Sequence, residues 1–205
     1  MIAPYALDAA NHIYNLLFCD DLSLWKGGSD TQSDLARVLA PAADVASLRA
    51  IAAKETAESR VRVLAFNRLR AMGEKVTPGI LLGTIVEVPL DGGLDTLAVF
   101  TDERIRYINQ TGKMAVFESP LPSMKDAIAV VLAASKTVVS RVGPWDKPRL
   151  PPPPKGSVRL SFLVSDGLYF GQGPFAQLSK DAMAGPVIRH AGELLVLVTN
   201  AATGH

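Results

Sequence analysis

The residues best suited to binding an anion form the run Asn109-Gln110-Thr111-Gly112-Lys113. Backbone N–H groups around Gly112, the Thr111 hydroxyl and the Lys113 ammonium could together cradle a negative group. The run is not a nucleotide-binding P-loop, because that motif opens a helix and here a strand-like apolar run follows. A tight turn without any ligand explains the same residues. The ligand-binding residues predicted for this region are Asn109, Thr111, Lys113, Asp102 and Tyr107.

Acidic residues gather on several predicted turns. Asp91 and Asp95 flank two glycines, a spacing that could hold a cation or perform general acid–base chemistry. The alternation of acids found in calcium loops is missing, and a hairpin turn with Asp95 at the start of a strand explains the pattern as well. Asp102 and Asp166 also fall on turns, where catalytic groups can gather. These positions are the whole basis for an enzyme hypothesis, and they do not define a mechanism.

Metal-binding and nucleophilic motifs are missing from the sequence. Of the three histidines, His12 and His205 have no partners at metal-ligand spacing, and His190 lies three residues before Glu193, which predicts an ordinary surface contact rather than an acid–base pair. Cys19 precedes two aspartates, which disfavour its thiolate, so it is expected to be a structural thiol. No G-x-S-x-G motif is present. We therefore predict no metal, no cofactor and no catalytic residue, and the sequence favours a protein that is not an enzyme without deciding the question.

Composition limits the partners. The 205-residue chain has a net charge of +1 and only 6% aromatic residues, so neither nucleic acid nor an anionic membrane is an expected partner. The longest apolar run, Ala127–Ala134, is far shorter than the roughly 18 residues that a membrane span needs. The N-terminus lacks the cationic segment of a signal peptide. A single cysteine fits a reducing compartment, and we expect a soluble, cytoplasmic protein.

The N-terminal segment is unusually apolar. Helical spacing predicts a helix from Pro4 to about Phe18. This helix either docks on the rest of the chain or meets another chain. On the second alternative, the chain self-associates as a homodimer or larger oligomer, or binds another protein. The predicted interaction surface is Ile13, Leu17, Phe18 and Trp25.

Two further helices are expected before the sheet. Asp30 or Ser33 is a suitable N-cap for a short helix that ends at Leu39. Asp44 is a suitable N-cap for a long helix, Val45 to about Met72, with Gly73 following its end. The polar turn at residues 54–59 marks either an exposed surface or a break in this helix.

The middle of the chain predicts an antiparallel meander. Apolar runs at residues 80–88, 94–100, 104–108 and 113–117 are separated by short turns, and such spacing requires hairpins. Pro89 is expected to end the first strand. Ser123 is expected to cap a helix that runs to about Arg141.

The final third begins with a proline-rich segment, residues 144–156, which is expected to be an extended connector. A hairpin at residues 158–164 and 168–170 follows, around an Asp-Gly turn. A helix is expected near residues 175–183. The last apolar run, 187–199, fits a helix better than a buried strand, although its periodicity allows both.

These features predict an α+β fold, an antiparallel sheet with helices packed on one face and a helical N-terminal region. Its parts are residues 1–75, 76–143, 144–156 and 157–205, within one compact domain. The first functional hypothesis is a non-catalytic interaction or assembly module. The second is a small-molecule binding or sensor domain, with an anionic ligand as one possibility, and the third is an enzyme of unrecognised type.

Overall fold

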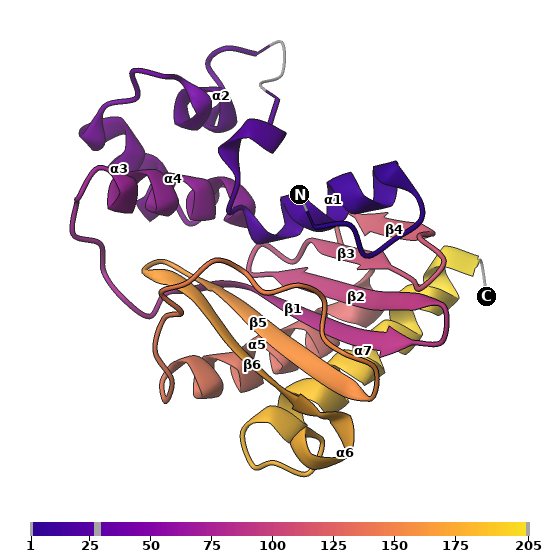
Figure 1. Cartoon of the computed structure of the whole chain (residues 1–205). Helices are drawn as coiled ribbons and strands as arrows, with labels where there is room; N and C mark the ends of the chain where they lie inside the picture. Colours follow the sequence, from indigo (N-terminus) through magenta and orange to yellow (C-terminus); the bar gives the residue numbers. More distant parts are fainter. Residues whose placement is uncertain (1, 27–29, 204–205) are drawn as a thin grey trace.

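The turn-rich middle of the chain folds back and forth as a meander, and a later hairpin extends the same sheet. The computed structural model describes residues 2–26 and 30–203. Within them, six antiparallel strands lie in the order β4-β3-β2-β1-β5-β6 (Figure 1). The strands are β1 (Leu81–Leu90), β2 (Gly93–Phe100), β3 (Ile105–Ile108), β4 (Met114–Phe117), β5 (Ser157–Val164) and β6 (Gly167–Pro174). The predicted α+β class is confirmed.

The first hairpin of the meander depends on two glycines. Gly92 has a φ of +88°, a left-handed conformation that glycine adopts at little cost. This residue lets the chain reverse in two residues, so that Leu90 pairs with Gly93. A Cβ on Gly93 would lie 2.0 Å from the Gln110 carbonyl oxygen, so only glycine fits where the β3–β4 turn approaches β2.

The prediction that Pro89 ends the first strand is wrong, because β1 continues to Leu90. Pro89 pairs with Leu94 of β2, whereas the pairing of β1 with β5 stops at Glu87 opposite Arg159. Beyond Glu87 the strand therefore has a neighbour on one side only. A proline is tolerated there because its missing N–H does not interrupt a two-sided ladder.

Two helices of the second half cover one face of the sheet. A short 3-10 turn, η2 (Pro122–Met124), leads into α5 (Lys125–Val139), and Ser123 does not cap that helix as predicted. After β6, which is longer than predicted, the chain forms α6 (Phe175–Leu178) and α7 (Ala184–Thr203). The helical alternative for the last apolar run is thus confirmed. Side chains of α5 and α7 share a core with one set of strand residues, including Val86, Leu97 and Leu160.

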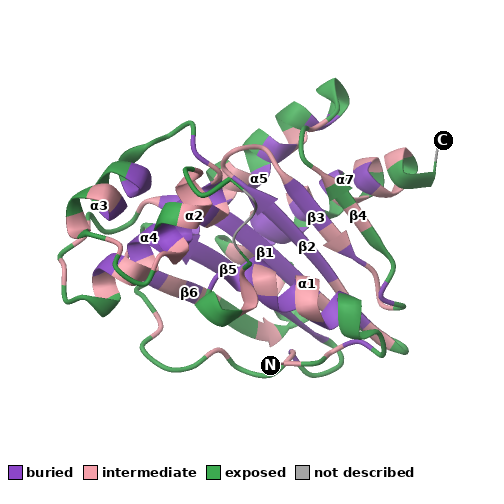
Figure 2. Cartoon of the chain, turned by 90° about the horizontal axis from the view of Figure 1, so that it is seen from above, coloured by how far each residue is buried: buried purple, intermediate pink, exposed green. Residues whose placement is uncertain are grey.

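The N-terminal helices cover the other face. They are α1 (Asp8–Phe18), η1 (Leu22–Leu24), α2 (Asp34–Leu39), α3 (Val45–Ala53) and α4 (Ser59–Ala71). Ser33 and Asp44 cap α2 and α3 as predicted. The helices share a second core with the alternate strand residues, including Ile85, Ala98 and Leu163. Helices therefore lie on both faces of the sheet, whereas the sequence predicted one, because the central strands are apolar on both sides. Figure 2 shows these strands buried between the two helical layers.

The predicted long helix at 45–72 is two helices, α3 and α4, which are separated at the polar turn. A residue distant in sequence caps the second helix, since the Asp102 carboxylate accepts a hydrogen bond of 2.7 Å from the Ser59 N–H. The turn between β2 and β3 thus sets where α4 begins. This capping contact could not be read from the helix sequence itself.

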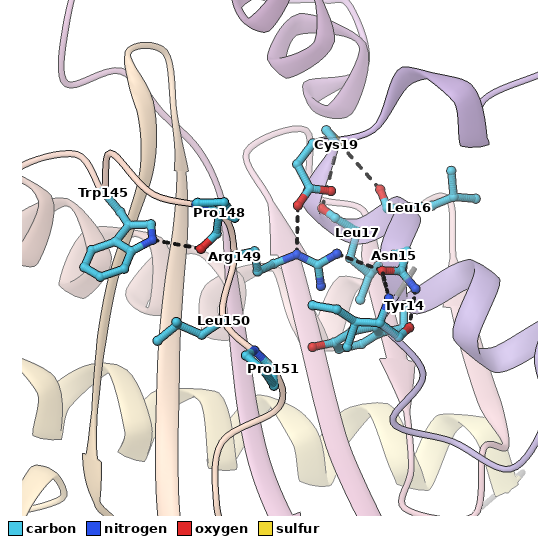
Figure 3. A network of polar contacts seen from close by, with 12 residues as sticks. Tyr14, Asn15, Leu16, Leu17, Cys19, Trp145, Pro148, Arg149, Leu150 and Pro151 are labelled. Carbon is cyan, nitrogen blue, oxygen red and sulfur yellow. Dashed lines mark hydrogen bonds and ion pairs between the residues drawn. The ribbon is translucent and has the colours of Figure 1, made fainter.

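The segment between α5 and β5 has no regular secondary structure and lies along the sheet and α1. The backbone N–H of Trp145 donates to the Leu168 carbonyl of β6 at 2.7 Å. Further along, Arg149 points toward α1, where its Nε donates to Asp20 and one terminal nitrogen donates to Asn15, each at 2.8 Å (Figure 3). Its guanidinium also lies 3.9 Å from the centre of the Phe18 ring. None of the helices in the described part of the chain is both long enough and apolar enough to cross a membrane.

Candidate functional site

A cavity of about 260 Å³ lies between the sheet and α7. Its floor consists of apolar side chains of β1 and β2, and one wall consists of α7 residues. Phe175, at the start of α6, lies at its edge and is exposed. The lining residues are Val86, Val88, Leu90, Asp95, Leu97, Tyr107, Phe175, Ile188, Ala191, Gly192 and Leu195. The cavity is therefore apolar, with polar side chains at one position only.

The polar position is formed by Asp95 of β2 and Tyr107 of β3. The Tyr107 hydroxyl donates to Asp95 Oδ2 at 3.0 Å, and the Gln110 N–H donates to Oδ1 at 2.7 Å. A carboxylate can accept about four hydrogen bonds, so Asp95 retains acceptor capacity toward the cavity. Burial, reinforced by the Asp95 charge, raises the pKa of Tyr107 well above its usual value, so the phenol stays protonated.

Gly192 lines the cavity on the helix side and is exposed. It lies within α7, where glycine is destabilising relative to alanine by about 1 kcal/mol. A Cβ built on Gly192 would have no neighbouring atom within 4 Å. Packing therefore does not require glycine at this position, and the missing side chain leaves open space beside the cavity.

The structure separates the predicted ligand-binding residues into two groups. Asn109, Thr111 and Lys113 lie on the β3–β4 turn, where Asn109 Oδ1 accepts from the backbone N–H groups of Thr111 and Lys113, both at 3.0 Å. The Asn109 side chain thus holds the turn together. Tyr107, which lies next to this turn, is the member of the predicted set that lines the cavity.

Asp102 lies at the other end of β3 and takes part in different contacts. Besides capping α4 it forms an ion pair of 2.7 Å with Arg104. Both contacts are on the side of the sheet that faces the N-terminal helices, whereas Tyr107 faces α7. The structure therefore does not bring Asp102 together with the other predicted ligand-binding residues.

The predicted interaction surface needs a correction. Leu17 and Phe18 are buried against the chain's own sheet, with relative exposures of 0% and 3%. Ile13 and Trp25 are partly buried and pack against the same core. The N-terminal helix thus docks on its own chain, because its apolar face meets an apolar sheet face. Self-association stays a prediction, without Leu17 and Phe18 as its surface.

A buried polar network under α1 was missed from the sequence. Arg159 and Glu87 form an ion pair across β5 and β1, and the Tyr14 hydroxyl donates to Glu87 at 2.7 Å. Arg159 also donates to the carbonyls of Leu150 and Pro151 in the segment before β5. A usable signal was present, since single charged residues within the apolar runs of β1 and β5 require a buried partner. These side chains are enclosed by their own partners and hold the layers together, so their role is structural.

In the described ranges, 2–26 and 30–203, no group of three or more His, Cys, Asp or Glu side chains could hold a metal ion. Cys19 is buried, and burial raises the pKa of its thiol far above the usual range. Comparisons of the chain with protein-family models, with curated proteins and with solved structures find no match. The geometry of the cavity is therefore the best guide to what this chain does.

Proposed function

We propose that this chain binds a small apolar molecule carrying one hydrogen-bond donor in the cavity between the sheet and α7. The observation that carries the proposal is the apolar lining that ends at the Asp95–Tyr107 pair. Binding sites for small molecules are typically concave and mostly apolar, with few polar groups that orient the ligand. This corresponds to the binding or sensor hypothesis from the sequence, with Tyr107 retained and with an apolar ligand in place of an anion.

The Asp95 carboxylate determines the preferred head group. A ligand amine or hydroxyl could donate to its remaining lone pairs, and an amine would add a charge-assisted hydrogen bond. A ligand carboxylate would meet like charge in a poorly solvated position, which is unfavourable. The ligand tail would lie along Val86, Leu97 and Leu195.

The test uses three probes of equal chain length, octylamine, octanol and octanoate, with binding measured by ligand-observed NMR and by thermal shift. We expect octylamine and octanol to bind and octanoate to bind much more weakly. Asp95→Asn should remove the preference for octylamine over octanol, because the charge is lost while an acceptor remains.

A second variant tests the location. Gly192→Leu places a side chain in the open space beside the cavity, and it should abolish binding of both probes. Val196→Leu is the matched control, because Val196 lies on the same helix with 57% exposure and does not line the cavity. Absence of binding by all three probes, or unchanged binding to Gly192→Leu, would contradict the proposal.

A further inference from the structure

The loop between α4 and β1 passes α3 at one end of the sheet (Figure 1). Residues of this loop, α3, α4 and α5 line a groove that is separate from the cavity. It consists of two adjoining hollows, of about 530 Å³ and about 420 Å³. Both hollows are lined by Glu55, Arg62 and Ile80. Arg62 of α4 therefore lies where the two hollows meet. The other cations that line the groove are Arg49 of α3 and Lys136 of α5.

The Arg62 side chain is mostly buried, but the end of its guanidinium is open to the groove and has no carboxylate partner. Its residue is 9% exposed, and its Nε donates to the Ala52 carbonyl at 2.9 Å. Within the described chain, its two terminal nitrogens donate no hydrogen bond and no carboxylate oxygen lies within 4.0 Å of them. Burial lowers the pKa of Arg62, and the charges of Glu55 and Asp102 offset this effect only in part.

The other buried arginines differ from Arg62 in this respect. Arg159 pairs with Glu87 at 2.6 Å, and Arg106 pairs with Glu118 at 2.5 Å. Buried charges in proteins are normally paired, because an uncompensated charge away from water is costly. The terminal nitrogens of Arg62 are instead open to the groove, because they are not among the buried polar atoms that lack a partner, and they are free to donate to a ligand oxyanion.

Further groups in the groove suit an oxyanion. Lys136 of α5 lines the smaller hollow, is exposed and forms no ion pair among the described residues. Thr77 lines the larger hollow and is exposed. Arg49 also lines the larger hollow, but it is already paired with Glu74 at 2.5 Å. Glu55 is the opposing charge in both hollows, which favours a ligand with one anionic group over a polyanion.

We propose that Arg62 and Lys136 bind the oxyanion group of a small acidic molecule, either a phosphate ester or a carboxylate. Arginine presents parallel N–H donors that match both oxyanions. The lysine adds a mobile point charge from α5, in the hollow that it lines together with Arg62. This site is independent of the α7 cavity and takes a ligand of the opposite charge preference.

The experiment is isothermal titration calorimetry of the full chain with inorganic phosphate, phenyl phosphate and benzoate. We expect saturable binding of at least one of them, and the ranking of phenyl phosphate against benzoate identifies the preferred oxyanion. Because the contacts are charged and partly exposed, the affinity should fall as sodium chloride is raised. Lys136→Gln should weaken binding about tenfold, as expected when one charge-assisted hydrogen bond is lost.

Arg62→Gln should weaken binding at least as much, provided that circular dichroism shows a folded variant. If Arg62→Gln does not fold, the exposed Lys136 decides the outcome. Lys125→Gln is the matched control, since it is another exposed lysine of α5 and does not line the groove. No saturable binding of any probe, no effect of Lys136→Gln, or an equal effect of Lys125→Gln would overturn the proposal. Gly192→Leu, which fills the other cavity, should leave this binding unchanged.

Discussion

Arg159 and Glu87 lie directly opposite each other on β5 and β1 and form a bidentate ion pair where the pairing of these two strands ends. Arg159 Nε is 2.6 Å from Glu87 Oε2, and Nη2 is 2.7 Å from Oε1. Both side chains are shielded from solvent, with exposures of 2% and 0%. Burial and the Glu87 carboxylate oppose each other at Arg159, and the net result is a raised pKa of its guanidinium. The pair joins the later hairpin to the meander at the face covered by α1.

Glu87→Gln should lower the free energy of unfolding by about 3 kcal/mol, because it leaves Arg159 buried without a counter-charge. Adding Arg159→Met should recover part of the loss, since no unpaired charge remains and the introduced amide oxygen can still accept from Tyr14. Urea denaturation measures both changes. Glu74→Gln is the control, because its ion pair with Arg49 is exposed on both sides, at 35% and 48%, and should contribute less than about 1 kcal/mol. Equal effects at the two positions would contradict this account of the buried pair.

The tyrosines make stability depend on alkaline pH. Burial is the largest cause at all four, and it raises the pKa of Tyr169 to about 12 and those of Tyr5, Tyr14 and Tyr107 further. The unfolded chain releases these protons near the ordinary value of 10.0, whereas the folded chain keeps them. The unfolded state then binds fewer protons, so the tyrosine contribution to stability is complete below pH 10 and falls as the pH rises further.

We therefore expect tyrosinate absorbance to appear together with the loss of the far-ultraviolet circular dichroism signal during an alkaline titration. A tyrosinate signal near pH 10 in a chain that is still folded would show that the phenols are accessible, contrary to the structure.

Gly192→Ala should raise the free energy of unfolding by about 0.8–1 kcal/mol, because alanine has the better helix propensity and the added methyl meets no atom. Thermal melting of the ligand-free chain measures the change. Gly185→Ala is the contrasting variant, since a Cβ there would lie 2.8 Å from the Ser179 carbonyl oxygen and should destabilise α7. A loss of stability in Gly192→Ala would mean that the space beside α7 is already filled.

Thr84→Val should stabilise the fold by about 1 kcal/mol, because the Thr84 hydroxyl is buried without a hydrogen-bond partner in the described chain. Thr96→Val should have the opposite effect, since the Thr96 hydroxyl is hydrogen-bonded to the Tyr5 hydroxyl at 2.8 Å in a buried position. Urea denaturation of the two variants compares them directly. A loss of stability in Thr84→Val would show that this hydroxyl has a bonded partner.

Asp102→Ala should lower the free energy of unfolding by about 1–2 kcal/mol through loss of the Ser59 cap. Asp102→Asn should cost less, because the amide oxygen still accepts from the N–H. Asp44→Ala, which removes the local cap of α3, should be similar in size. Hydrogen exchange of the first turn of α4 locates the effect. If Asp102→Ala leaves exchange at that turn unchanged, the carboxylate does not cap the helix in solution.

Much of the fold could be predicted because it depends on local signals. Hairpins formed where Asp91-Gly92 and Asp166-Gly167 interrupt apolar runs, since few residues accept the backbone conformations of such turns. Ser33 and Asp44 capped the helices that follow them for an equally local reason. Where local signals conflicted with context, the predictions failed. Pro89 stays in a strand because β5 no longer pairs with β1 beyond Glu87. Helix α4 begins at Ser59 because the carboxylate of Asp102, distant in sequence, caps it there.

Of the candidate site, the sequence determined residue types and strand faces but not their partners. Tyr107 was predicted to bind a ligand from its place beside a polar turn, and Asp95 was recognised as a turn acid. Only the tertiary structure decided that the two are hydrogen-bonded and that Gly192 of α7 lies across from them. The same holds for Arg62. Only the packing of α3, α4, α5 and the loop before β1 shows that its guanidinium has no carboxylate partner within the described chain. Turns and caps follow from contacts within a few residues, whereas a cavity and an arginine without a partner in a groove follow from how layers formed by distant segments pack together.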